Sequence, residues 1–288
     1  MKARPIVRRS RALRGPESAR HPSATSPWDR RRLRQRSFDE CASLYERARP
    51  GYPERLFDDL VRLSGIPPGG RILEVGPGPG TATLPLARRG FRILAIELSR
   101  AMARRCRKNL APFPRTTVLN QAFEDWPVET GAFDLVVAAT ALHWLHPRLA
   151  FCRTANALRP GGSLAILRNF RDTPADPLHR ELDRAYREVG LPARVPAPER
   201  RFRRRITALR RSGRFGRILT RRYPWTRVYT PGEYIDLLCT MSDHAVMPTS
   251  TRRRLFRRIR SILTEHGGRY ARRYIGLLVL ARKRPPAR

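Results

Sequence analysis

Glycines at alternate positions follow a carboxylate in the stretch Glu74-Val75-Gly76-Pro77-Gly78-Pro79-Gly80. The apolar run before them, Ile72–Val75, has the composition of a short buried parallel strand, so Glu74 stands near the end of a strand. A turn without side chains lets a ligand lie directly on backbone amides. The expected order is strand, bare loop and helix, with Thr81 as the cap of a helix that extends through Arg89 and Gly90 placed to end it.

The glycine pattern excludes two common phosphate sites. In the dinucleotide fingerprint G-x-G-x-x-G the third glycine would fall on Thr81, and a phosphate loop would need Gly-Lys-Ser/Thr. A second carboxylate, Glu97, ends the next expected strand about twenty residues after the glycines, where open α/β nucleoside sites place a ribose-binding acid. The alternative is a tight turn whose glycines are needed only for packing.

A histidine follows the fourth expected strand, Phe133–Ala139, in the stretch Thr140-Ala141-Leu142-His143-Trp144-Leu145. Open α/β sheets bind ligands at the carboxyl ends of their strands. Because its unperturbed pKa lies near neutrality, His143 is a candidate general base, although a packing role is the alternative. His143 and His146 have no carboxylate nearby in sequence, so no metal site is predicted.

The motif Glu-x-Gly-x-Gly-x-Gly resembles motif I of the class I S-adenosylmethionine-dependent methyltransferases. The stretches Phe123-Glu124-Asp125-Trp126, Ala141–Trp144 and Leu158–Gly162 resemble features of small-molecule methyltransferases of the trans-aconitate and malonyl-carrier type. The segment from Phe38 to Pro53 is similar to an N-terminal segment of one methyltransferase subgroup. The resemblance covers roughly residues 38–281.

The resemblance implies S-adenosyl-L-methionine as cofactor and a Rossmann-like α/β fold. In that fold a mostly parallel seven-stranded sheet has helices on both faces, with a helical insertion before the last two strands. Tyr45 and His143 are the catalytic candidates, although Tyr45 could instead pack its helix onto the domain. The resemblance places cofactor contacts at Arg49, Glu74, Gly76, Gly78, Gly80, Glu97, Leu98, Phe123, Glu124 and Ala139. One position departs from the family, because Ala122 stands where an acid often contacts adenine.

The chain divides by composition into a basic extension, residues 1–36, and a methyltransferase domain, residues 37–288. The extension has few apolar residues and no period, so we expect it to be disordered, although its composition also resembles a transit peptide. Cap helices are expected within residues 37–65, and the helical insertion within residues 175–215.

The formal net charge is +36, and only three of the sixty basic residues are lysines. Clustered arginine can neutralise a polyanion, but the scarcity of lysine favours a general arginine bias of composition. We therefore expect nucleic-acid binding to be non-specific at most. Isolated cysteines fit a reducing cytoplasm, and the longest apolar stretch is too short to cross a membrane. The oligomeric state is not predicted.

The predicted activity is methyl transfer to a small-molecule acceptor. Such a displacement needs alignment and exclusion of water more than it needs many catalytic groups. One alternative is an RNA or DNA methyltransferase that uses the arginine-rich surface. Another is a protein of the same fold that binds the cofactor without turnover, which the intact Glu74, glycines and Glu97 disfavour.

Overall fold

A computed structural model of the chain describes residues 42–191 and 198–285. The predicted N-terminal extension and Phe38 lie outside the described residues. Seven strands form one sheet in the order β3-β2-β1-β4-β5-β7-β6. The strands are β1 (Arg71–Val75), β2 (Arg92–Glu97), β3 (Thr116–Asn120), β4 (Phe133–Ala139), β5 (Leu158–Arg171), β6 (Phe215–Tyr229) and β7 (Tyr270–Lys283).

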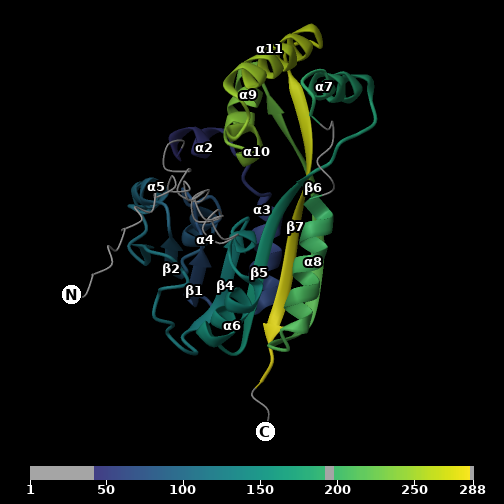
Figure 1. Cartoon of the computed structure of the whole chain (residues 1–288). Helices are drawn as coiled ribbons and strands as arrows, with labels where there is room; N and C mark the ends of the chain where they lie inside the picture. The colour runs from purple at the N-terminus through teal and green to yellow at the C-terminus, as the bar shows by residue number, and fades with distance from the viewer. Residues whose placement is uncertain (1–41, 192–197, 286–288) are drawn as a thin grey trace, which may run out of the picture.

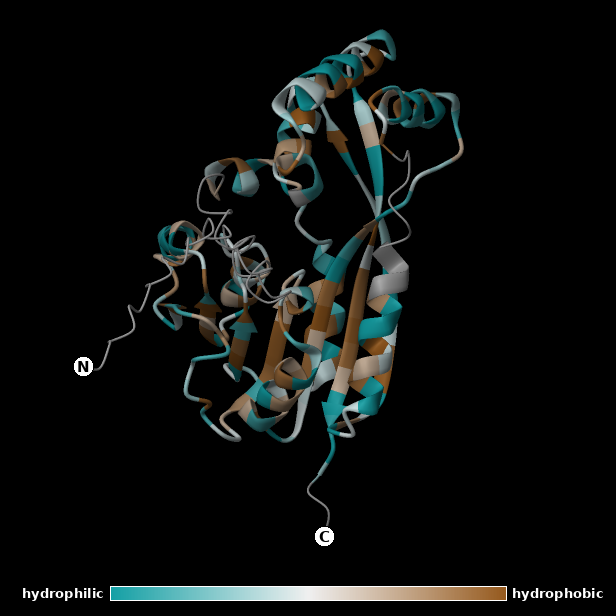
Figure 2. Cartoon of the chain, viewed as in Figure 1, coloured by the Kyte–Doolittle hydropathy of each residue, from teal (hydrophilic) through white to brown (hydrophobic). Residues whose placement is uncertain are grey.

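The first five strands are parallel, and β7 runs antiparallel to both β5 and β6. This confirms the predicted class I methyltransferase fold with its mostly parallel sheet. The central strands are nearly all apolar because helices cover both of their faces. In Figure 2 their hydrophobic residues form a continuous band through the sheet.

Helices lie on both faces of the sheet and beyond one end of it (Figure 1). They are α2 (Ala42–Ala48), α3 (Glu54–Ser64), α4 (Thr83–Arg88), α5 (Arg100–Leu110), α6 (Pro147–Ala157), α7 (Pro177–Glu188), α8 (Pro198–Arg211), α9 (Pro231–Cys239), α10 (Ser242–Ala245) and α11 (Thr249–Glu265). One core packs α3, α4 and α5 against the sheet, and a second packs α6 and α8 against the opposite face.

A third core belongs to a separate region that we call the lobe. The lobe consists of α7, α9, α10, α11 and the paired ends of β6 and β7, residues 225–229 and 270–274. In Figure 1 it stands at the top, on the side toward which β1 and β2 point. The lobe therefore overhangs the carboxyl edge of the parallel strands.

The prediction that Thr81 caps the helix after the glycine loop is wrong by one residue. The helix α4 begins at Thr83, its N-cap residue is Ala82, and no side chain caps it. The reason is local: Gly80 has a φ of +96°, which a helix cannot include, and its carbonyl accepts a hydrogen bond from Leu84 N at 2.9 Å. The loop is therefore one residue longer than predicted.

Candidate active site

The three glycines of the loop have three different surroundings. Each has a positive φ, at +67° for Gly76, +60° for Gly78 and +96° for Gly80. A Cβ on Gly76 would meet the Cβ of Ala141 at 2.7 Å, and a Cβ on Gly80 would lie 3.4 Å from Cys106 Sγ. A Cβ on Gly78 would meet nothing within 4 Å. Close packing therefore requires a glycine at Gly76, the positive φ disfavours a side chain at Gly80, and Gly78 borders open space.

Glu74 is a fully buried carboxylate next to this loop. Neither of its oxygens has a hydrogen-bond partner. Burial raises the pKa of Glu74 to about 7; the nearby hydroxyl of Thr83 partly opposes this rise, and the charge of Glu97 adds to it. A buried carboxyl group in this state can serve a cationic ligand, since it would ionise when a positive charge arrives.

Glu97, in contrast, is held at both oxygens. Its Oε2 accepts a hydrogen bond from Gly78 N at 3.0 Å, and its Oε1 accepts one from Ser99 N at 2.8 Å. Asn120 donates to the backbone carbonyls of Glu97 and Leu98, at 2.9 and 3.0 Å, and so joins the ends of β2 and β3.

Thr140, directly after β4, has the one positive φ among the described non-glycine residues, at +55°. Its amide donates to Leu167 O at 2.9 Å, and its hydroxyl is 2.9 Å from the hydroxyl of Tyr52. Burial raises the pKa of Tyr52, so its hydroxyl stays protonated. Strained backbone conformations of this kind are frequent at binding sites. The residue types around Thr140 do not indicate its positive φ.

A cavity of about 80 Å³ opens beside Thr140 at the carboxyl ends of β4 and β5. Its lining includes His143, whose role as a general base stays a prediction. The insertion helix α8 contributes Phe202 and Arg205 to the wall, and β5 contributes Arg168. Sequence reasoning missed these three residues because they come from a separate helix and from the far end of a strand.

The cap helix α2 covers the glycine loop through one asparagine. Asn109 of α5 donates a hydrogen bond to Glu46 of α2 and another, at 2.9 Å, to the carbonyl of Pro79 in the loop. Arg49 follows α2, lies 4.9 Å from the ring of Tyr45 and donates to Thr240 O at 2.7 Å. Arg49 therefore ties the cap to the lobe, and the predicted contact of Tyr45 and Arg49 with ligands stays a prediction.

The remaining predicted cofactor residues lie along the same edge of the sheet. Phe123 is buried and stacks on Trp126 with ring centroids 6.1 Å apart, so it is a core aromatic whatever else it contacts. Glu124, Leu98 and Ala139 are half-buried, and Ala139 ends β4 immediately before Thr140. Their contacts with adenine, ribose and methionine remain predictions.

Comparison with known proteins places this geometry in a family. The family described as "Methyltransferase domain" matches residues 72–162, which span the loop, β2 and β4. An uncharacterised methyltransferase of Mycobacterium bovis is 31% identical over 232 residues, which cover 80% of this chain and 86% of the relative. This chain is a class I S-adenosylmethionine-dependent methyltransferase.

Two further similarities concern the subgroup and the fold of the methyltransferase. A malonyl-[acyl-carrier protein] O-methyltransferase of Geobacter sulfurreducens is 34% identical over 122 residues, covering 41% of this chain and 45% of the relative. The solved phosphoethanolamine N-methyltransferase 2 of Haemonchus contortus has a TM-score of 0.54 at 17% identity. It aligns with 92% of this chain, which spans 62% of its length, and it supports the fold alone.

No helix among the described residues is long and apolar enough to cross a membrane. Within residues 42–191 and 198–285 no three His, Cys, Asp or Glu side chains gather as a metal site requires.

Proposed function

We propose that this methyltransferase acts on a small-molecule acceptor that binds in the cavity beside Thr140 and His143. The observation that carries the proposal is the size and place of this cavity, about 80 Å³ at the carboxyl ends of β4 and β5. It has room for the reacting end of a small molecule. Its wall includes a helix from outside the parallel sheet, which helps to exclude water from the acceptor.

The residues of the loop fit the cofactor. When bound, S-adenosylmethionine supplies a methyl group on a sulfonium sulfur. Glu74, buried and without a partner, suits the cationic amino group of the methionine part. Gly78 leaves space for that part beside the backbone, and Glu97 would accept hydrogen bonds from the ribose hydroxyls. The cap helix with Tyr45 and Arg49 would close over the same ligand.

His143 is the group that would accept a proton from the acceptor. A displacement at the methyl carbon needs a base only where the attacking atom carries a proton. His143 lies in the cavity wall within one turn of Thr140, so it can receive a proton from a molecule held there. The aromatic ring of Phe202 and the guanidinium groups of Arg168 and Arg205 would orient the acceptor against that base.

The experiment incubates the purified methyltransferase with methyl-labelled cofactor and either a small-metabolite extract or total RNA. We expect label in a defined small molecule, with at least tenfold less label for His143→Asn. The matched control is His146→Asn, which lies outside the cavity and should keep its rate. Cofactor binding with no labelled product in any fraction would instead support a protein that binds the cofactor without turnover.

Nucleic acid is the second candidate, and one groove favours it. A surface groove of about 680 Å³ between the start of α6 and α8 is lined by Arg148, Arg203, Arg204 and Arg211. Its lining contains no tyrosine or tryptophan, and its phenylalanine, Phe151, is buried and cannot stack on bases. We therefore expect salt-sensitive binding without sequence preference. Label at a defined RNA position would overturn the small-molecule proposal.

A further inference from the structure

Arg272 is a buried cation in the core of the lobe. It lies on β7 between Tyr270 and Tyr274, and all three side chains point to the face covered by helices. The residue is 4% exposed, and its Nε and Nη1 atoms have no hydrogen-bond partner. A guanidinium group cannot lose its proton, so this charge remains inside the lobe.

Two tyrosine rings lie against this guanidinium, whose Nε and Nη1 atoms are buried without a hydrogen-bond partner. The guanidinium carbon lies 5.2 Å from the ring centroid of Tyr234 and 5.2 Å from that of Tyr274. Cation–π contacts of this kind stabilise a buried arginine through its faces. These contacts supply no oxygen acceptor for Nε and Nη1, whose N–H groups therefore stay without a hydrogen bond.

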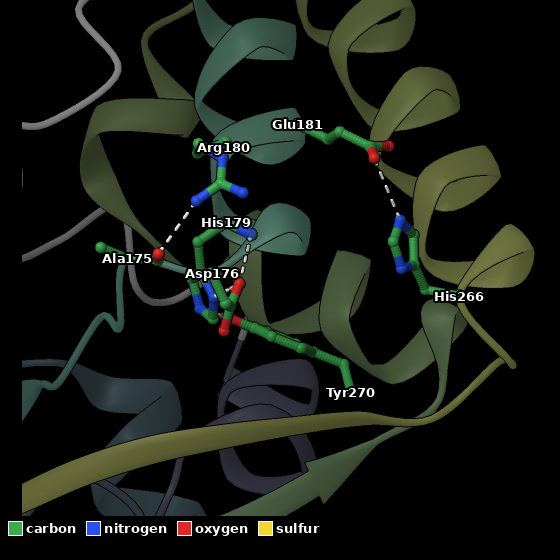
Figure 3. A network of polar contacts seen from close by, with 7 residues as sticks. All are labelled: Ala175, Asp176, His179, Arg180, Glu181, His266 and Tyr270. Atoms are coloured by element: carbon green, nitrogen blue, oxygen red, sulfur yellow. Dashed lines mark hydrogen bonds and ion pairs between the residues drawn. The ribbon is translucent and has the colours of Figure 1, made fainter.

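The carboxylates of the lobe that lie near these tyrosines are already bound to histidines. Asp176 accepts a hydrogen bond from His179, with 2.7 Å between Oδ1 and Nδ1, and His179 Nε2 is 3.0 Å from the hydroxyl of Tyr270. Figure 3 shows these hydrogen bonds together with the pair Glu181–His266, which joins α7 to the end of α11. In the described part of the lobe no carboxylate pairs with Arg272.

A second Asp–His–Tyr series of hydrogen bonds has the same form. In it Asp243 contacts His244, and His244 Nε2 is 2.9 Å from the hydroxyl of Tyr186. Both tyrosines feel the charge of Arg272. The two Asp–His pairs therefore fix the tyrosines around the arginine and do not neutralise it.

One hydroxyl donor also remains available beside Arg272. The hydroxyls of Tyr229 and Tyr274 are 2.9 Å apart, so one proton lies between the two oxygens. The second proton of this pair can be donated to a ligand. A buried charged group with two unpartnered nitrogens and a neighbouring O–H donor has the chemistry to bind a carboxylate or a phosphate.

We propose that Arg272, with Tyr229 and Tyr274, binds the carboxylate or phosphate group of a small molecule. Contacts run from this site to the cavity: Trp225 stacks on Tyr274 at 5.1 Å and donates to Asn169, which donates to Gly51 beside Tyr52. Arg272 lies four residues of strand, about 13 Å, beyond Gly276, which pairs with Asn169.

The carboxylate or phosphate group that Arg272 binds has two possible sources, a free anion or the far end of the methyl acceptor. The second reading rests on the proposed function, and it requires an acceptor whose anionic group lies on the order of 1 nm from its reacting atom. The two sources share one recognition chemistry, so one binding site serves both.

The test is calorimetric titration of the full chain with inorganic phosphate and with succinate, at constant ionic strength. We expect saturable binding by the wild type, at least tenfold weaker binding by Arg272→Met, and unchanged binding by Arg222→Met, which removes an exposed arginine from β6. Saturating phosphate or succinate should raise the Tm of the wild type and leave that of Arg272→Met unchanged. Equal affinity in Arg272→Met, or no saturable binding of either anion by the wild type, would overturn the proposal.

If Arg272→Met does not fold, Tyr229→Phe removes only the hydroxyl donor and should weaken binding at least threefold; unchanged affinity in it would count against the site. Binding of S-adenosylhomocysteine, measured on the same samples, should be equal in wild type and Arg272→Met, which separates this proposal from the proposed function. Inhibition of methyl transfer by a saturating anion identifies the acceptor as the source, and unaffected transfer identifies a free anion. Both results support the site.

Discussion

The parallel half of the sheet and the lobe each bury a charged side chain without a partner. In the parallel half it is Glu74, and in the lobe it is Arg272. The difference between them is chemical. Burial raises the pKa of Glu74 to about 7, so this carboxyl can become neutral, whereas the guanidinium of Arg272 keeps its charge. The parallel half can therefore remain without a ligand at little cost, and the lobe cannot discharge its cation.

The two halves also differ in how their charges are surrounded. Glu74 stands beside backbone, in a loop where Gly78 leaves open space. Arg272 stands among aromatic side chains from β6, β7 and α9. The first arrangement suits a ligand that follows the backbone, and the second suits one charged group held by side chains. The predictions below, in decreasing order of expected effect, test this difference.

The largest effect is expected in the glycine loop. Gly76→Val would place a Cβ 2.7 Å from the Cβ of Ala141 at a φ of +67°. Overpacking and backbone strain together should lower the free energy of unfolding by about 4 kcal/mol. The new Cβ of Gly78→Ala would meet no protein atom, so this variant should lose less than half as much free energy of unfolding. It should nevertheless bind the cofactor weakly. Chemical denaturation and calorimetry measure the two effects, and equal stability loss in both variants would contradict the separate roles.

Glu74→Gln should remove a pH dependence of stability. The pKa of Glu74 rises from 4.5 to about 7 on folding, so the folded protein holds a proton that the unfolded chain releases between those values. Stability therefore falls as pH rises from 4.5 to 7, by about 3 kcal/mol when complete. At pH 5 the Glu74→Gln variant should be only slightly less stable than the wild type. At pH 8 it should be more stable than the wild type. If the free energy of unfolding depends on pH in the same way in both proteins, Glu74 is not the group that causes this pH dependence.

Glu97→Ala should weaken cofactor binding at least tenfold. A charge-assisted hydrogen bond contributes about 1.5–3 kcal/mol, and Glu97 also holds the amide of Gly78. The control is Asp125→Ala, since Asp125 is exposed in the loop after β3 and should leave the dissociation constant unchanged. Calorimetry with S-adenosylhomocysteine gives both constants, and the reverse ranking would mean that the ribose site has been misplaced.

The smallest effect is expected at two helix caps, one in the parallel half of the sheet and one in the lobe. Ser99 caps α5 by accepting from Met102 N at 3.2 Å, and Thr230 caps α9 with the reciprocal hydrogen bonds of a capping box. Each substitution by alanine should cost about 1 kcal/mol of stability. Only Ser99→Ala should also weaken cofactor binding, because loss of the cap loosens the backbone from which Ser99 N donates to Glu97. A cofactor effect from Thr230→Ala would show that the two halves are coupled.

The sequence predicts the parallel half well because its signals are local. Glycines, a strand and a terminal carboxylate occur within a few residues at Glu74–Gly80, so the loop and its sheet edge follow from neighbouring positions. The strain at Thr140 depends on the bond to Leu167 O, and the wall residues Phe202 and Arg205 depend on where α8 packs. Contacts between distant segments of this kind cannot be read from spacing.

The lobe carried a signal that the sequence analysis did not use. Tyr270, Arg272 and Tyr274 alternate with exposed residues, so the strand period places an arginine on the same face as two tyrosines. Which face is buried depends on α9 and α11, whose packing over that face is a long-range contact. The pattern indicates a buried arginine only once the cover is known.

The central claim is that Glu74 ionises to receive the cationic part of the cofactor. The measurement is calorimetry of S-adenosylhomocysteine binding at pH 6 in two buffers of different ionisation enthalpy. With a pKa of about 7, Glu74 is mostly protonated at this pH, so binding should release close to one proton from the wild type and none from Glu74→Gln. Binding without proton release, or equal release by the two proteins, would contradict the account.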